Sequence, residues 1–261
     1  MDLVVYILAG AAVGFAVGVT GVGGGSLMTP LLLLFGFPPH VAVGTDLLYA
    51  SITKAGGVVV HKRQGTIRWN IVFYLFAGSL PASLATVYVL HSYFPDSESY
   101  GHVLTSMLGI MLILTSIVLL FRKKILSESH EHNKSGILAH LQHHSPRYTW
   151  AMGVLLGIMV TLSSVGAGAF GAAVLLLLYP RLPSINVVGT DLAHAVPLTL
   201  VAGTGHLFLG NVDFYLLGAL LVGSLPAIYV GTKVATRLPE KFLQPMLASM
   251  LLALGVKYAF F

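Results

Sequence analysis

The chain has 261 residues, of which 56% are hydrophobic and only 9% carry a charge. Soluble domains are about 45–50% apolar and about 25% charged, so this composition excludes an ordinary water-soluble globule. The formal net charge is +5, which in a membrane protein indicates Lys and Arg in cytoplasmic loops rather than a nucleic-acid partner. The chain has no cysteine, which excludes disulfides, thiolate metal sites and thiol-based sulfur relays.

Eight apolar segments follow one another along the chain, most of them long enough for the roughly 20 residues that cross a bilayer. They cover residues 3–36, 41–60, 69–90, 101–121, 148–180, 185–209, 212–232 and 242–261. The first segment follows Met1-Asp2 without the basic region or cleavage site of a signal peptide, so we expect it to be retained.

The polar stretch 122–147 divides the chain into two halves that repeat one pattern, an N-terminal repeat 1–121 and a C-terminal repeat 148–261. A shift of 145 positions superimposes Val43–Leu47 (VGTDL) on 188–192, and Gly78–Ala82 (GSLPA) on 223–227. Roughly a third of the positions between 21 and 82 are identical under this shift. Internal repeats of this kind are typical of secondary transporters.

The basic residues predict how the repeats are oriented. Lys and Arg gather in the loops at 61–68, 122–147 and 233–241, which the positive-inside rule places in the cytoplasm. This placement requires residues 148–180 to enter and leave on one face, as a hairpin, and by symmetry residues 3–36 as well. We therefore expect an all-α polytopic membrane protein of two inverted-topology repeats, each a Gly-broken hairpin plus three transmembrane helices. That makes about eight helices, or up to ten with both hairpin arms counted, and places both termini outside.

The two hairpins are broken by glycine-rich stretches at residues 21–26 and 166–171. A return arm of about 11 residues rises about 16 Å, half the hydrocarbon thickness, so each break should lie near the membrane midplane. The exposed N–H groups and dipole of a helix N-terminus can bind an anion there. The candidate substrate-binding residues are Thr20, Gly21, Gly23, Gly24, Gly25, Ser26, Ser163, Ser164, Gly166 and Gly168. The alternative is that the glycines only allow helices to pack closely.

Three charged residues fall inside the expected spans, namely Asp46, Asp191 and Lys54. A carboxylate within a membrane is costly and marks a functional site, here a candidate for proton coupling. Alternatively, Thr45 with Asp46 and Thr190 with Asp191 form the N-cap and first turn of their helices. Lys54 either neutralises an acid or binds an anion, or it extends to the cytoplasmic surface.

Prolines and histidines complete the candidates. Pro81 and Pro226 occupy equivalent places in the two repeats and should kink their helices, which makes them hinge candidates. Five histidines in the central loop could bind a divalent metal, but no fixed ligand spacing supports a site, so we expect no metal centre there. They are His130, His132, His140, His143 and His144. Nothing in the sequence indicates a nucleotide or other cofactor, because no P-loop motif occurs.

Taken together, Gly21–Gly25 with Pro30, the VGTD pair, the repeated GSLPA and the basic loop after His61 resemble the TauE/SafE family of sulfite exporters. The resemblance covers nearly the whole chain. It implies a permease of the prokaryotic inner membrane that exports sulfite or an organosulfonate such as sulfoacetate, with access alternating as one repeat moves against the other. A divalent metal-ion transporter and an uncoupled anion channel are the alternatives. The lipid bilayer and a small anion are the expected partners, nucleic acid is not, and no enzyme active site is expected.

Overall fold

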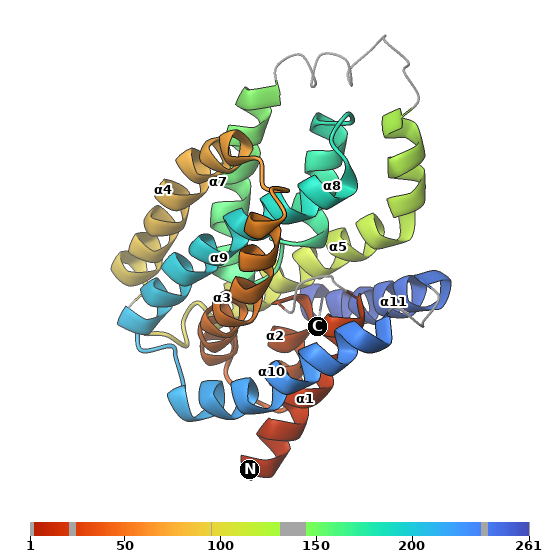
Figure 1. The fold of residues 1–261 in the computed structure, drawn as a ribbon. Helices are drawn as coiled ribbons and strands as arrows, with labels where there is room; N and C mark the ends of the chain where they lie inside the picture. Colours follow the sequence, from red (N-terminus) through yellow and green to blue (C-terminus); the bar gives the residue numbers. More distant parts are fainter. Residues whose placement is uncertain (1–2, 21–24, 95, 131–144, 236–239, 261) are drawn as a thin grey trace.

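The computed structural model describes residues 3–20, 25–94, 96–130, 145–235 and 240–260. Over these ranges it contains ten α-helices and no strand, as the composition predicts (Figure 1). The helices are α1 Leu3–Thr20, α2 Gly25–Leu34, α3 Pro39–Arg63, α4 Trp69–Tyr93, α5 Gly101–His130, α7 Ser145–Ser163, α8 Ala169–Leu178, α9 Ser184–Phe208, α10 Phe214–Ala235 and α11 Glu240–Phe260.

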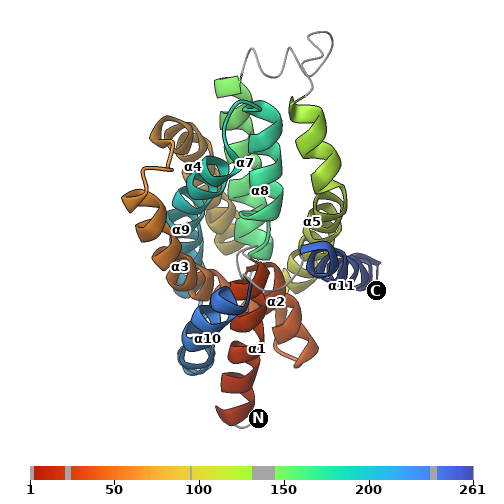
Figure 2. The ribbon, with the colours of Figure 1, turned by 45° about the vertical axis from the view of Figure 1, so that its right-hand side comes forward.

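Both long apolar segments are interrupted where glycines cluster. Helices α1 and α2 are separated by residues 21–24, which lie outside the described residues, and α7 and α8 by residues 164–168. In the second break Ser164, Gly166 and Gly168 have positive φ angles of 59°, 127° and 142°. Glycine adopts such angles without a steric penalty, which ends α7 and lets α8 start in a new direction beside it (Figure 2).

Within the described residues, four helices are long and apolar enough to cross a membrane, namely Trp69–Tyr93, Gly101–Phe121, Ser184–Phe208 and Phe214–Val234. Their outward faces carry large exposed apolar side chains, such as Phe73 at 71% and Val222 at 64% exposure. A surface of this kind suits lipid rather than water. Helix α3 is equally long, but its middle carries buried polar residues.

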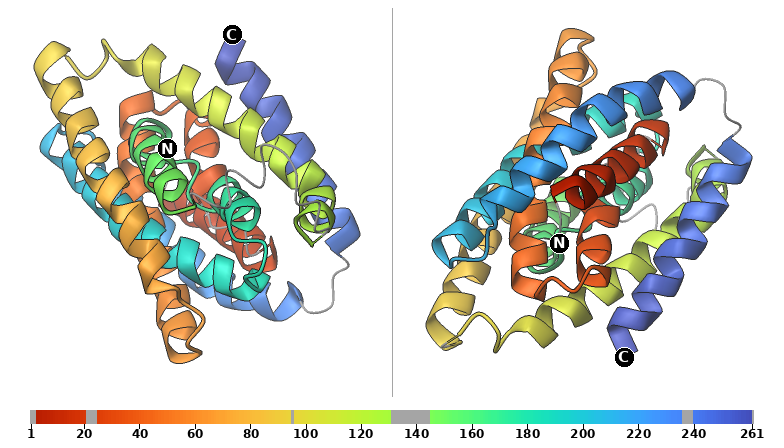
Figure 3. Two further views of the ribbon diagram at one scale, coloured as in Figure 1. Left: turned by 90° about the horizontal axis from the view of Figure 1, so that it is seen from above. Right: turned by 90° about the horizontal axis from the view of Figure 1, so that it is seen from below.

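The main helix contacts join one half of the chain to the other. Helix α1 packs along α10, α4 along α7, α3 along α9 and α5 along α11, the last pair lying side by side in Figure 3. Glycines allow the backbones to approach closely, because a Cβ on Gly14 would lie 2.6 Å from Ser224 Cα of α10, and one on Gly78 would lie 2.8 Å from Val154 N of α7. The two repeats are therefore interlocked.

The centre of the molecule is formed by α3 and α9 (Figure 1). The stretch from Ala42 to Ser51 in α3 is buried throughout, and the equivalent stretch of α9 is mostly buried. Polar residues on these two helices are thus buried at the centre of the fold.

The helices next to the central polar stretch are longer than predicted. Helix α5 continues to His130 and α7 already begins at Ser145. Arg, Lys and Leu are good helix formers, so the basic residues after position 121 extend α5 rather than ending it. His132, His140, His143 and His144 lie outside the described residues.

Candidate functional site

The VGTD motifs lie inside their helices, not at their beginnings. Helix α3 begins at Pro39 and α9 at Ser184, with Pro38 and Pro183 as the N-cap residues. The expectation that Thr45/Asp46 and Thr190/Asp191 form the first turns of their own helices is therefore wrong. Proline presets the backbone angle that suits a helix start, so the prolines upstream begin both helices two turns earlier.

Asp46 is fully buried and is held by the short helix α2 of the same half. Its Oδ2 accepts a hydrogen bond from the backbone N–H of Thr29, at 3.1 Å, and another from the Thr29 hydroxyl. Its Oδ1 has no hydrogen-bond partner, although the Ser164 hydroxyl of the second break lies close to the carboxyl group. Asp46 of the first half thus lies between α2 and the second glycine break.

Asp191 occupies the equivalent place beside α8. A Cβ on Gly171, near the start of α8, would collide with Asp191 Oδ1. The repeat equivalent of Thr29 is Val174, which offers no hydroxyl, and Asp191 Oδ1 has no hydrogen-bond partner. The two acids are therefore equivalent in position and different in how far their oxygens are satisfied.

Lys54 is buried and interacts with both acids. Its side chain is only 5% exposed, and its Nζ donates a hydrogen bond to the carbonyl oxygen of Ala167 in the second break, at 3.2 Å. It also interacts electrostatically with Asp191 and Asp46. The lysine thus lies inside the protein and does not extend to the membrane surface.

The predicted substrate-binding residues fall into three groups. Ser163 uses its hydroxyl to fix the break itself, because it bonds Met159 O at 2.6 Å and the backbone of Val165. Ser164 keeps a buried hydroxyl without a partner, beside the positive-φ glycines of the break. Thr20, Gly25 and Ser26 end α1 and begin α2, whereas Gly21, Gly23 and Gly24 lie outside the described residues.

The VGTD threonines bind the starts of helices in the opposite half. Thr45 Oγ1 accepts a hydrogen bond from the backbone N–H of Asp213, immediately before α10, at 3.1 Å. Thr190 Oγ1 accepts one from Arg68 N, the N-cap residue of α4, at 3.0 Å. Arg68 and Asp213 are equivalent under the 145-residue shift. In one bond the first half supplies the accepting threonine and the second half the donor, and in the other bond the reverse holds.

The serines of the GSLPA motifs lie beside the two central helices, Ser79 beside α9 and Ser224 beside α3. His194 Nε2 and Ser79 Oγ lie 2.8 Å apart, and the equivalent Tyr49 hydroxyl lies close to Ser224 Oγ. The sequence drew attention to the prolines of this motif and missed its serines. Pro81 and Pro226 lie inside α4 and α10, and their hinge role stays a prediction.

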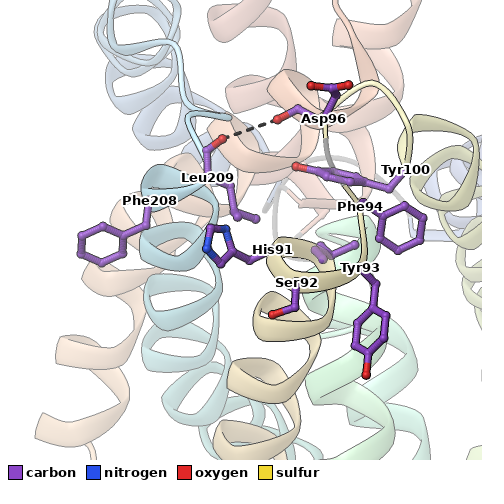
Figure 4. A pocket seen from close by; sticks show the side chains of 10 residues that line it. His91, Ser92, Tyr93, Phe94, Asp96, Tyr100, Phe208 and Leu209 are labelled. Carbon is purple, nitrogen blue, oxygen red and sulfur yellow. Dashed lines mark hydrogen bonds between the residues drawn. The ribbon is translucent and has the colours of Figure 1, made fainter.

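Two pockets lie away from this centre. One, of about 380 Å³, lies among the ends of α4 and α9 and the start of α5, where His91, Tyr93 and Phe208 line it (Figure 4). The other, of about 490 Å³, lies next to Trp69, Tyr74 and Tyr179. Asp46, Lys54 and Asp191 line neither pocket. Among the described residues, no group of three or more metal-ligating side chains occurs.

Comparison with known proteins identifies the family to which the chain belongs. The profile of the family described as "Sulfite exporter TauE/SafE" matches residues 6–258. The chain belongs to the TauE/SafE sulfite exporter family. It is a multi-pass membrane transporter and not an enzyme, as the sequence predicted.

The relatives agree with this family. The probable membrane transporter protein YjnA of Bacillus subtilis is 37% identical over 251 residues, which cover 96% of this chain and 97% of YjnA. YdhB of the same organism, also a probable membrane transporter protein, is 31% identical over 96% of this chain and 98% of its own length. A probable membrane transporter protein of Xylella fastidiosa is 27% identical over 91% of this chain and 86% of its own. No solved structure matches the chain significantly.

Proposed function

We propose that this protein is a secondary transporter that exports a small sulfur-containing oxyanion, such as sulfite or sulfoacetate, across the prokaryotic inner membrane. The observation that carries the proposal is the convergence of the short helices α2 and α8 on one buried cluster, made of Asp46, Lys54 and Asp191. Helix N-termini offer backbone N–H groups and a positive dipole to an anion, and Lys54 adds a full positive charge. Membership of the sulfite exporter family supports the choice of substrate.

The anion would bind between the two breaks. Backbone N–H groups of residues 164–168 and the Ser164 hydroxyl would contact it from one half, and backbone N–H groups at the start of α2 would contact it from the other. The substrate is small, because the side chains around the cluster are buried. Asp46 and Asp191 are the candidates for coupling transport to protons.

The contacts support an inverted relation of the repeats. In Figure 1, α1 rises from the lower end toward the centre, whereas its equivalent α7 descends from the upper end. Thr45 and Thr190 each bind the start of a helix in the other half, with the roles of the halves exchanged. We infer that residues 122–147 face the cytoplasm and both termini the outside.

Alternating access would not move one intact repeat against the other. Helix α1 is packed closely on α10 and α4 on α7, and each pair joins the two halves. Separating the halves would break both contacts. We therefore propose moving bodies built from helices of both repeats, in place of the movement of one repeat against the other that the sequence predicted.

A flux assay in liposomes tests the function. The purified protein is reconstituted and the liposomes are loaded with sulfite, sulfate, thiosulfate, sulfoacetate or a divalent metal ion. Sulfite or sulfoacetate should leave the liposomes faster than the other solutes. The absence of flux above empty liposomes for both, or flux of the metal ion alone, would contradict the proposal.

A pair of glycine variants tests the location of the site. Gly168→Leu, at a φ of 142° in the second break, should abolish flux, because leucine cannot adopt this conformation without strain. Gly218→Leu is the matched control, since a Cβ there meets nothing within 4 Å. Normal flux of a folded Gly168→Leu protein would refute the site.

A further inference from the structure

The buried cluster contains more charge than its hydrogen bonds satisfy. Two carboxylates and one ammonium group are 0%, 2% and 5% exposed, on Asp46, Asp191 and Lys54. Burying a charge in a medium of low dielectric constant is costly unless an opposite charge compensates it. With both acids ionised the cluster carries one excess negative charge, and binding of a monovalent anion together with one proton leaves that net charge unchanged.

One carboxyl oxygen of each acid, Asp46 Oδ1 and Asp191 Oδ1, accepts no well-aligned hydrogen bond, and the buried Ser164 hydroxyl lies beside the Asp46 carboxyl group. A bare carboxylate oxygen can accept a proton, and a bare hydroxyl can donate to an anion. The Lys54 ammonium donates a hydrogen bond to the carbonyl oxygen of Ala167, in the same glycine break as Ser164. The cluster therefore has unused capacity for both a proton and an anion.

We propose that Lys54 binds the transported anion, and that Asp191 and Asp46 are the groups the anion replaces as partners of the lysine. This inference rests on the proposed function. When an anion approaches the ammonium group, the carboxylate that interacted with it takes up a proton from the same side of the membrane. When the anion leaves, the carboxylate releases the proton and interacts with Lys54 again. Only the carboxyl O–H bond forms and breaks, and the net charge of the cluster is the same before and after a monovalent anion binds.

Asp191 is the acid that we expect to take up the proton first. Asp46 is held by two hydrogen bonds from Thr29, whereas the equivalent residue beside Asp191 is Val174. Hydrogen bonds to a carboxylate favour its charged form. Because Thr29 is replaced by Val174 in the second half, Asp191 should accept a proton more readily than Asp46, although the two acids occupy equivalent positions.

Two other titratable groups face the cluster. The Tyr49 hydroxyl lies near Asp46 and beside Ser224, and His194 interacts with Lys54 while bonding Ser79. A second positive charge on His194 would repel the ammonium group of Lys54, and an unperturbed tyrosine hydroxyl is already protonated at neutral pH. The carboxylates are therefore the groups that accept the proton.

The coupling has a direction. Because the anion and the proton cross together, an inward proton gradient opposes export. The protein then exports the anion only when the outward concentration gradient of the anion exceeds the opposing proton gradient. A proton gradient imposed on liposomes should accordingly drive sulfite toward the side to which protons flow.

The experiment compares wild type with Lys54→Met, Lys54→Arg and Asp191→Asn. Lys62→Met is the matched control, because Lys62 lies on the same helix and is exposed. Sulfite is added to weakly buffered, detergent-solubilised protein with a pH indicator, and sulfite flux is measured in liposomes with and without a pH gradient. Size-exclusion chromatography checks that each variant is folded.

Wild type and Lys62→Met should take up protons when sulfite binds, and their flux should follow the pH gradient. Lys54→Met should lower flux roughly 30-fold or more, as expected when one partner of a buried charge group is lost, and Lys54→Arg should restore part of it. Asp191→Asn should take up fewer protons than wild type when sulfite binds, and its remaining flux should respond more weakly to the pH gradient.

Sulfite flux in wild type without proton uptake, or undiminished flux in folded Lys54→Met, would overturn this inference and leave the proposed function intact. The absence of sulfite and sulfoacetate flux in wild type would overturn both. If Lys54→Met does not fold, the comparison of proton uptake between wild type and Asp191→Asn tests the inference, and equal uptake by the two proteins would overturn it.

Discussion

Replacing Gly223 by alanine tests the close contact between the two halves. Gly223 of α10 lies against α1, and a Cβ at this position would be 2.8 Å from Ala11 N and closer still to Ile7 O. Ordinary van der Waals contact begins at 3.4 Å, so the two helices would have to move apart. Gly218 lies on the same helix, is exposed, and has nothing within 4 Å of its Cβ position.

The two substitutions should change stability in opposite directions. Alanine is up to about 1 kcal/mol more favourable than glycine inside a helix, so Gly218→Ala should stabilise the protein. Gly223→Ala gains the same amount but adds an overpacking cost of about 1–3 kcal/mol, which backbone atoms cannot relieve by a rotamer change. The difference between the variants isolates the contact and should be about 1–3 kcal/mol.

Thermal unfolding in detergent, at one scan rate for all variants, measures this difference. About 1 kcal/mol corresponds to a shift of roughly 2–4 °C for a chain of this size, and a fixed scan rate matters because unfolding of such proteins is often irreversible. Gly223→Ala should unfold below wild type and Gly218→Ala at or above it. Equal midpoints for the two variants would refute the close approach of α1 and α10.

Two further perturbations address the centre of the protein. Thr45→Val and Thr190→Val each remove a hydrogen-bond acceptor from the start of a helix in the other half and should lower the free energy of unfolding by about 1 kcal/mol. The hydroxyl of Thr204 bonds only its own helix, so Thr204→Val should be nearly neutral in the same unfolding assay. Gly171→Ala should push the Asp191 carboxyl group away from α8 and weaken the response of sulfite flux to a pH gradient; an unchanged response would contradict the placement of this acid.

The elements of the fold were predictable because they depend on local signals. Apolar length predicted the helices, and clustered glycines predicted the interruption of the segments 3–36 and 148–180. The alternative interpretation of the VGTD motifs as helix caps was wrong, although the predicted segments 41–60 and 185–209 begin close to the observed starts of α3 and α9. The prolines upstream decide the start, and the threonines serve helices in the other half.

The candidate site depends on contacts that no local pattern reveals. The sequence singled out Asp46, Asp191 and Lys54 as charges within apolar segments, but not that Lys54 bonds a residue 113 positions away. The unequal surroundings of the two acids could have been found by comparing Thr29 with Val174 in the repeat alignment. The contact of Ser79 in GSLPA could not be predicted from the sequence, because it requires the packing of α4 on α9, which depends on the whole fold.

The pairing of α1 with α10 also determines when the chain can finish folding during synthesis. Helix α1 is synthesised before the other described helices, yet the helix that fills its glycine-lined face begins only at Phe214. Until then that face meets only lipid or transient neighbours, and α7 must arrive before α4 is covered. The N-terminal half therefore cannot reach its final packing alone, and a ribosome that stalls before α10 leaves an inserted but unassembled protein.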